Sequence, residues 1–181
     1  MKDFLESIKE RRSVRKYEEK EIPEEMLNQV LESVRWSPSW ANTQCWEIVV
    51  VKDPVIKERL QATLPEKGNP ARTAMIQAPA VLALCGKLKS SGYYKDQAAT
   101  RLGDWFMFDL GIAAQTLCLY AGYLGLGTVI VGLFDHDRAK EVLKVPAGYE
   151  LTAMIPIGYP AKKTEAPKRK ELREFIHKDT F

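Results

Sequence analysis

Cysteine and histidine are scarce in this chain of 181 residues, which has 3 Cys and 2 His. Cys45, Cys85 and Cys118 lie far apart and form no C-x-x-C pair. Their spacing argues against a disulfide framework, a zinc site built from cysteines and a four-cysteine iron–sulfur site within one chain. Only His136 and His177 offer imidazoles, so a site built from several histidines is not expected either. We therefore predict no metal site.

A large charge of either sign is also missing. The chain has 27 Lys+Arg against 24 Asp+Glu, a formal net charge of +3, and this excess is too small to predict nucleic-acid binding. The N-terminal residues 1–17 carry many charges and no apolar stretch, unlike a secretory signal. Because the three cysteines are also interpreted as reduced thiols, we predict a cytoplasmic protein.

One long apolar run needs its own account. Residues 105–124 contain a single charge, Asp109, and the run is long enough to cross a bilayer. A helix buried in the core or in a subunit interface is the favoured interpretation, because Asp109 and Gln115 lie inside the run and no second span exists. We predict no membrane segment.

The hydrophobic pattern predicts helices and strands that share one domain, residues 1–181. Helices are expected at residues 2–11, 23–36, 54–63, 71–77, 97–124 and 137–143, the last with Asp135 as N-cap. Strands are expected at residues 46–51, 80–85, 128–133 and 151–158. The fold class is therefore α/β, of the α+β kind, with a four- or five-stranded sheet flanked by helices. The polar residues 87–95 form a predicted loop and a candidate lid.

Three arginines stand within five residues, at Arg11, Arg12 and Arg15. Their mutual repulsion favours an anion or several carboxylates among them. In an extended segment Arg11, Ser13 and Arg15 point to one side, and two guanidinium forks with a hydroxyl between them suit a phosphate. The alternative is a solvated basic patch that pairs with nearby glutamates, Glu10, Glu18 and Glu19.

A polar loop leads into the first expected strand. Ser39, Asn42, Thr43 and Gln44 place several hydrogen-bond donors and acceptors on it, an arrangement that suits the edge of a polar planar ring. The alternative is ordinary turn chemistry, because Ser, Pro and Asn favour turns for backbone reasons.

Glycines near the end of the apolar run do not form a dinucleotide-binding motif. Gly122, Gly125 and Gly127 follow a helix and precede a strand, and Ile130 stands where G-x-G-x-x-G needs glycine. We interpret them as a helix stop with tight helix–strand packing. Gly132, near the end of an expected strand, instead marks a place where another group approaches the backbone.

No Ser–His–Asp or Cys–His arrangement and no G-x-S-x-G motif is evident, which fits chemistry carried by a bound cofactor. The clusters and their order resemble the nitroreductase family of FMN-dependent flavoproteins over nearly the whole chain. The resemblance rests on residues 11–17, residues 37–44 with Trp46, Asp109-x-Gly-x-Ala-x-Gln115, Gly125-Leu-Gly-Thr128, Ile157-Gly-Tyr-Pro160 and the basic tail. It implies a nitroreductase-like, mostly antiparallel sheet and a homodimer. The long apolar helix would form the dimer core, and two FMN sites would lie at the subunit interface.

The resemblance also implies residue roles. Arg11, Ser13 and Arg169 hold the FMN phosphate, with Arg12 and Lys168 as helpers. Arg15 lies by the pyrimidine edge of the flavin, where its charge supports the anion that grows during reduction. Four loop residues reach the flavin held mainly by the other chain: Pro38, Ser39, Asn42 and Gln44. The backbone that faces flavin N5 and O4 belongs to Val131, Gly132 and Leu133, so no side chain is expected to act as an essential acid. For the basic run at 168–170, taken alone, a solvated tail is the alternative.

The function that follows is an FMN-dependent oxidoreductase. It would take hydride from NADH or NADPH through flavin N5 and pass it to a nitroaromatic or a quinone in a ping-pong cycle. Two alternatives stay open: a flavin-binding protein without NAD(P)H turnover, and a nucleic-acid binder that uses the basic clusters. The family also contains dehalogenating and ring-cleaving members. The acceptor is left open by four departures from the family pattern, at Trp40, Cys45, Gly132 and Glu171.

Overall fold

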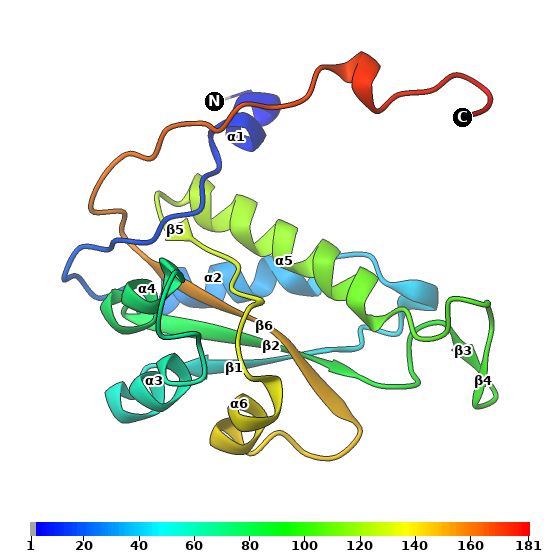
Figure 1. Ribbon diagram of the computed structural model, residues 1–181, viewed down its shortest axis with the longest axis horizontal. Coiled ribbons are helices and arrows are strands. Elements are labelled where there is room, and N and C mark those ends of the chain that lie inside the picture. Colours follow the sequence, from blue (N-terminus) through cyan, green and yellow to red (C-terminus); the bar gives the residue numbers. More distant parts are fainter. Residues whose placement is uncertain (1–2) are drawn as a thin grey trace.

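Four strands form one antiparallel sheet in the order β1-β2-β6-β5 (Figure 1). The structure is a computed structural model that describes residues 3–181. The strands are β1 (Trp46–Val51), β2 (Ala80–Lys87), β5 (Gly127–Thr128) and β6 (Tyr149–Gly158). This arrangement confirms the predicted α+β class and the antiparallel sheet. Three of the four strands start and end within two residues of their predicted bounds.

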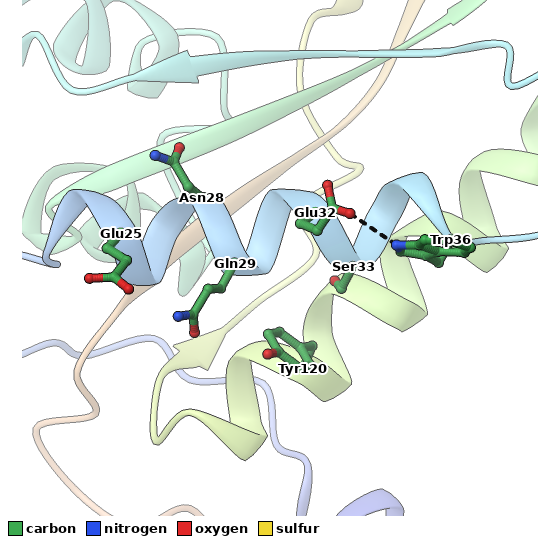
Figure 2. A pocket seen from close by; sticks show the side chains of 7 residues that line it. All are labelled: Glu25, Asn28, Gln29, Glu32, Ser33, Trp36 and Tyr120. Carbon is green, nitrogen blue, oxygen red and sulfur yellow. Dashed lines mark hydrogen bonds between the residues drawn. The ribbon is translucent and has the colours of Figure 1, made fainter.

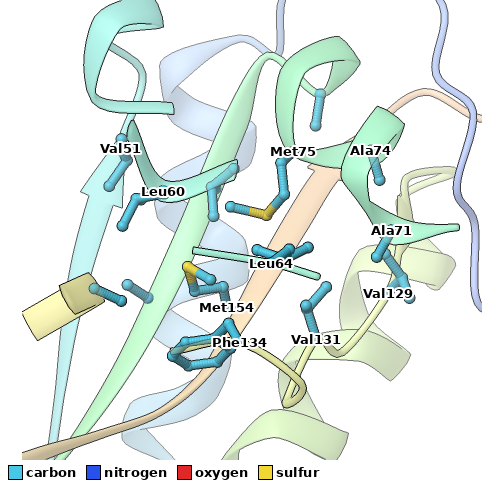
Figure 3. Close-up of a cluster of buried hydrophobic side chains, with 14 of the residues drawn as sticks. Val51, Leu60, Leu64, Ala71, Ala74, Met75, Val129, Val131, Phe134 and Met154 are labelled. Carbon is cyan, nitrogen blue, oxygen red and sulfur yellow. The ribbon is translucent and has the colours of Figure 1, made fainter. Parts of the chain in front are cut away.

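Helices cover both faces of the sheet. One face carries α2 (Glu24–Arg35) and α5 (Phe106–Tyr123), and the other carries α3 (Pro54–Gln61), α4 (Ala71–Gln77) and α6 (His136–Leu143). Alternate residues of β2 point to opposite faces of the sheet. Leu82 and Leu84 pack with α2 and α5, whereas Val81 and Ala83 pack in the apolar cluster on the face of α3, α4 and α6, part of which Figure 3 shows. A strand buried on both faces is apolar without alternation, which is why residues 80–85 form an unbroken apolar run.

Local signals set the helix ends. α1 spans Phe4–Glu10, and its predicted start at residue 2 lies outside the described residues. Asp135 caps α6 as predicted, because its Oδ1 accepts the backbone N–H of Arg138 at 3.1 Å. At the end of α5, Gly125 has a φ of 81° and the N–H of Leu126 donates back into the last turn at 2.8 Å, which is a Schellman stop.

The third expected strand is wrong beyond its first residue. β5 ends at Thr128, and Val131 forms only an isolated bridge with Met154. Opposite this point β6 contains Pro156, whose carbonyl accepts the Val129 N–H at 3.4 Å. A proline has no N–H to return to the neighbouring strand. The ladder is therefore interrupted, and beyond it Val131 still exchanges two hydrogen bonds of 2.9 Å with Met154 of β6.

The expected helix at residues 97–124 begins only at Phe106. The residues before it form a small hairpin, which also replaces part of the loop predicted at 87–95. The hairpin consists of β3 (Tyr93–Tyr94) and β4 (Gln97–Ala98). Its turn uses left-handed backbone at Lys95 and Asp96, with φ of 49° and 61°. We call residues 88–104 the hairpin segment; Figure 1 shows it beyond the N-terminal end of α5.

α5 presents apolar side chains on two sides. The side facing the sheet buries Leu110, Ala113 and Leu117. On another side Met107 and Phe108 are 60% and 61% exposed and line a groove of about 540 Å³. Within residues 3–181, no helix has the length and apolar character that a membrane span needs. The outer side of α5 is thus apolar and open in a single chain.

Candidate functional site

The arginine-rich segment runs in extended form beside the edge of the sheet. Ser13 pairs with Thr128 in a parallel bridge, and the Val14 N–H donates to the Thr128 carbonyl at 2.9 Å. The buried Tyr17 hydroxyl lies 2.8 Å from the Val14 carbonyl and 3.0 Å from the Pro156 carbonyl. Burial raises the pKa of Tyr17, so the phenol remains a neutral donor. These contacts fix the segment by its inward residues and leave the arginines available to a ligand.

A basic pocket of about 690 Å³ opens where this segment meets the end of α5. Its wall includes four cationic side chains, Arg11, Arg12, Lys162 and Lys163, and one carboxylate, Glu10. The rest of the wall comes largely from the last turns of α5 and from β5. Four cations against one carboxylate make this pocket attractive to an anion.

The guanidinium groups keep donors free for such an anion. Nη1 of Arg12 donates to two backbone carbonyls, with the Arg11 carbonyl at 2.8 Å. Nε of Arg12 is buried and has no partner among the described residues. A buried donor without an acceptor is costly, and an anionic oxygen would satisfy it. The ion pairs of the described chain use other cations, namely Lys9, Arg35, Lys52 and Lys140.

A smaller pocket of about 210 Å³ lies next to the basic segment. It brings together four residues of the predicted site, Arg15, Val131, Gly132 and Leu133. Its further wall, residues 68–71, is missing from the prediction. Asn69 fixes this wall, because its Nδ2 donates to the Leu133 carbonyl at 3.3 Å. A Cβ added to Gly132 would meet nothing within 4 Å, so a ligand has room beside this backbone. Turn-forming residues at 68–70 indicate a loop in the sequence but not its position.

The polar loop before β1 lies at the opposite end of α5. It contains a short 3-10 turn, η1 (Trp40–Asn42), and the Trp40 N–H lies 3.1 and 3.2 Å from the two carboxylate oxygens of Asp109. Ser39 Oγ accepts the Gln44 N–H at 2.9 Å, and Gln44 Nε2 donates to Asn42 Oδ1 at 3.2 Å. The loop thus has a defined shape of its own, away from the basic pocket.

One chain alone does not bring this loop to the arginines. Asp109, which holds the loop, stands in the first turn of α5, whereas Gly122, in the wall of the basic pocket, stands in the last. Helix rises 1.5 Å per residue, so these two positions are about 20 Å apart. The loop residues of the predicted site are therefore remote from Arg11 within a chain.

Asp109 is the residue whose contacts the sequence leaves unknown. Its carboxylate is buried, with 1% of the residue exposed, and accepts the Ser91 hydroxyl at 2.6 Å as well as the Trp40 N–H. The Cys45 thiol lies 3.6 Å away. Burial, and then the Asp109 charge, raise the pKa of Cys45 to about 12, so this thiol is a protonated neighbour and not a nucleophile. In the sequence, the one feature that singles out Asp109 is that it is the only charged residue in the apolar run 105–124.

Lys168 and Arg169 stand apart from the basic pocket. Both are exposed in the C-terminal tail, which passes α1 and then extends away from the sheet (Figure 1). Among the described residues, the lysines that line the pocket are Lys162 and Lys163, close behind β6. The basic character of the tail is evident in the sequence, but only the path of the chain decides which lysines approach Arg11.

A further groove of about 690 Å³ lies between α2 and α5 (Figure 2). Glu25 and Glu32 line it together with Trp36 and Tyr120. The side-chain hydrogen bond from Arg35 lowers the pKa of Glu32, which also accepts the Trp36 indole N–H at 2.9 Å. Two carboxylates make the groove unsuitable for a phosphate, and it contains no residue of the predicted site.

The fold and the site define an α+β protein with a basic pocket beside an antiparallel sheet. The profile of the Nitroreductase family matches residues 8–159, and the chain belongs to this family. It is 30% identical over 164 residues to a Methanothermobacter thermautotrophicus protein provisionally named NADH dehydrogenase/NAD(P)H nitroreductase, with 88% of this chain and 78% of that protein covered. Identity to FMN reductase (NAD(P)H) of Bacillus subtilis is 27% over 192 residues, covering 100% and 75%. The solved structure of an FMN-dependent nitroreductase from Clostridium difficile is similar with a TM-score of 0.81 at 26% identity, covering 98% and 99%.

Proposed function

We propose that this chain is an FMN-dependent oxidoreductase that takes hydride from NADH or NADPH and passes it to an oxidised small molecule. The observation that carries the proposal is a pair of pockets on one extended segment, a basic one at Arg11 and Arg12 and a smaller one at Arg15. FMN joins a phosphate to a planar ring, and this pair of pockets suits both ends. Relatives named for FMN support the same cofactor.

The basic pocket is assigned to the phosphate. Arg11 and Arg12 offer charge-assisted hydrogen bonds, and the unpaired Nε of Arg12 supplies a donor that a phosphate oxygen would satisfy. Ser13 lies between the two pockets in the sequence. The resemblance assigns Arg169 to the phosphate and Lys168 as its helper. Within one chain we propose that Lys162 and Lys163 supply positive charge there, because they line the pocket.

The smaller pocket is assigned to the reactive part of the flavin. FMN, when bound, supplies the hydride-transfer chemistry. Arg15, whose Nη1 donates to the Ser13 carbonyl at 3.2 Å, keeps a positive charge at the wall, where it stabilises negative charge that develops during reduction. The backbone around Gly132 lines the same pocket and leaves space for an approaching ring. No side chain of this site needs to donate a proton.

We further propose that the active form is a homodimer in the cytoplasm. Apolar helices are normally buried on every side, and the open groove on α5 includes Met107, Phe108 and Ile112. Two antiparallel α5 helices packed through this groove would bring the 38–44 loop of one copy, at the first turn of α5, toward the basic pocket of the other, at the last turn. The three cysteines are unpaired and buried, as expected in a reducing compartment.

An absorbance experiment tests the proposal. We expect the freshly purified protein to show flavin bands in the visible spectrum, and NADH or NADPH added under nitrogen to bleach them. Bands that persist with both nucleotides but disappear with dithionite would favour a flavin-binding protein with another electron donor. A colourless protein that takes up no FMN would refute the proposal. Reoxidation by a nitroaromatic, a quinone or a halogenated phenol then identifies the acceptor class.

A further inference from the structure

The Asp109 carboxylate joins segments that lie far apart in the sequence. It accepts the Trp40 N–H from the loop before β1 and the Ser91 hydroxyl from the hairpin segment. The ion pairs of the described residues do not include Asp109. Its charge is instead stabilised by its donors and by the N-terminal end of α5. Burying a carboxylate carries a desolvation cost. The donors around Asp109 must offset this cost, which a buried apolar side chain would not carry.

A ring contact connects the same two segments. The rings of Trp40 and Trp105 lie 5.1 Å apart. Trp105 is tied to the hairpin segment twice: its backbone N–H donates to the Ser91 carbonyl at 3.0 Å, and its indole N–H donates to Thr100 Oγ1 at 2.9 Å. The hairpin segment and the 38–44 loop are therefore held at one hub, with the Asp109 carboxylate as its polar part.

We propose that Asp109 is a positioning residue that couples the hairpin segment to the 38–44 loop. The proposal rests on the proposed function, which assigns the 38–44 loop to the flavin held by the other subunit. FMN that immobilises the loop would, through Trp40, Asp109 and Ser91, also immobilise the hairpin segment. Asp109 lines neither the basic pocket nor the smaller one, and its contact with the proposed cofactor site is the Trp40 N–H of the 38–44 loop. It therefore acts through the loop and not on the reacting atoms.

Hydrogen exchange of the full-length protein, with and without FMN, tests the coupling. The amide protons of Ala99 and Trp105 are suitable probes, because both donate to carbonyls of the hairpin segment, at 2.8 and 3.0 Å. In the wild type we expect FMN to slow their exchange about tenfold. In Ser91→Ala, which cuts the tie at its hairpin end, the slowing should fall below about threefold, since a hydrogen bond to a charged group shifts a local opening equilibrium by about tenfold or more.

Two further variants complete the design. Thr152→Val removes a hydroxyl that donates to the Leu84 carbonyl at 3.1 Å, outside the hub, and should retain the wild-type slowing. Asp109→Asn keeps the shape but removes the charge, and should accelerate exchange of the Trp40 amide about tenfold. FMN affinity, measured by flavin fluorescence, should stay within about twofold in Ser91→Ala.

The outcomes separate the two proposals. If FMN binds Ser91→Ala and protects the hairpin probes as strongly as in the wild type, the coupling through Asp109 is refuted while the proposed function stands. If the wild type binds no FMN, both proposals fail. Loss of protection in Ser91→Ala but not in Thr152→Val supports the coupling.

Discussion

Replacing Arg11 by alanine should weaken FMN binding much more than it slows the chemistry. Arg11 lines the basic pocket as one of four cations opposed by one carboxylate. A hydrogen bond to a charged partner contributes about 1.5–3 kcal/mol, and each 1.4 kcal/mol changes the dissociation constant about tenfold. Because Arg12 and the two lysines remain, we expect the lower part of this range, a Kd for FMN about 10- to 30-fold higher.

Arg15→Ala should behave in the opposite way. Arg15 belongs to the smaller pocket and not to the basic one. Its removal should change the Kd for FMN by no more than about threefold. It should slow flavin reduction by NADH or NADPH about tenfold or more, because a preorganised positive charge next to developing negative charge is lost.

Two measurements at fixed ionic strength separate these roles. Fluorescence titration gives the FMN dissociation constant, and anaerobic stopped-flow absorbance gives the reduction rate of the FMN-saturated protein. Arg35→Ala is the matched control, since it removes one positive charge from an exposed pair with Glu32. Equal loss of flavin in Arg11→Ala and Arg15→Ala would refute the assigned roles. An equal loss in Arg35→Ala would show that the change in net charge alone explains the weaker binding.

Other predictions concern the dimer, the alkaline range and the helix–strand packing. Ile112→Glu, on the open side of α5, should convert the dimer into a monomer in light-scattering chromatography and reduce FMN binding; a dimer that persists would contradict the proposed interface. Stability should fall as pH rises above about 9, because the buried thiols keep raised pKa values in the folded protein and ionise at lower pH in the unfolded chain. Urea unfolding at pH 10 should show a loss of at most about 2 kcal/mol per thiol, and a smaller total loss in Cys45→Ala. Gly127→Ala places a Cβ 2.6 Å from Val14, so unfolding should become easier by about 1–3 kcal/mol, whereas Gly122→Ala, with nothing within 4 Å, should leave stability unchanged or higher.

Short-range patterns predicted most of the fold. β1 and α4 have the predicted bounds because an apolar run and a helical period are properties of neighbouring residues. The Asp135 cap is local in the same way. The hairpin was not predictable, because alanine-rich composition at 97–99 favours a helix while the turn at residues 95 and 96 and the packing of Trp105 decide otherwise. β5 is short because of Pro156 on a strand that follows it in the chain.

In the candidate site, too, some features follow from neighbouring residues in the sequence and others depend on the tertiary structure. By itself the sequence determined the arginine cluster, the polar loop and the family resemblance, because each is written in residues that are neighbours in the chain. Only the tertiary structure decided that Arg15 shares a pocket with Gly132, that Lys162 and not Lys168 approaches Arg11, and that Asp109 holds Trp40 and Ser91. The physical reason is that such contacts depend on the path of the chain across a packed sheet. Many apolar contacts between residues far apart in the sequence determine this path together, and the spacing of neighbouring residues does not predict it.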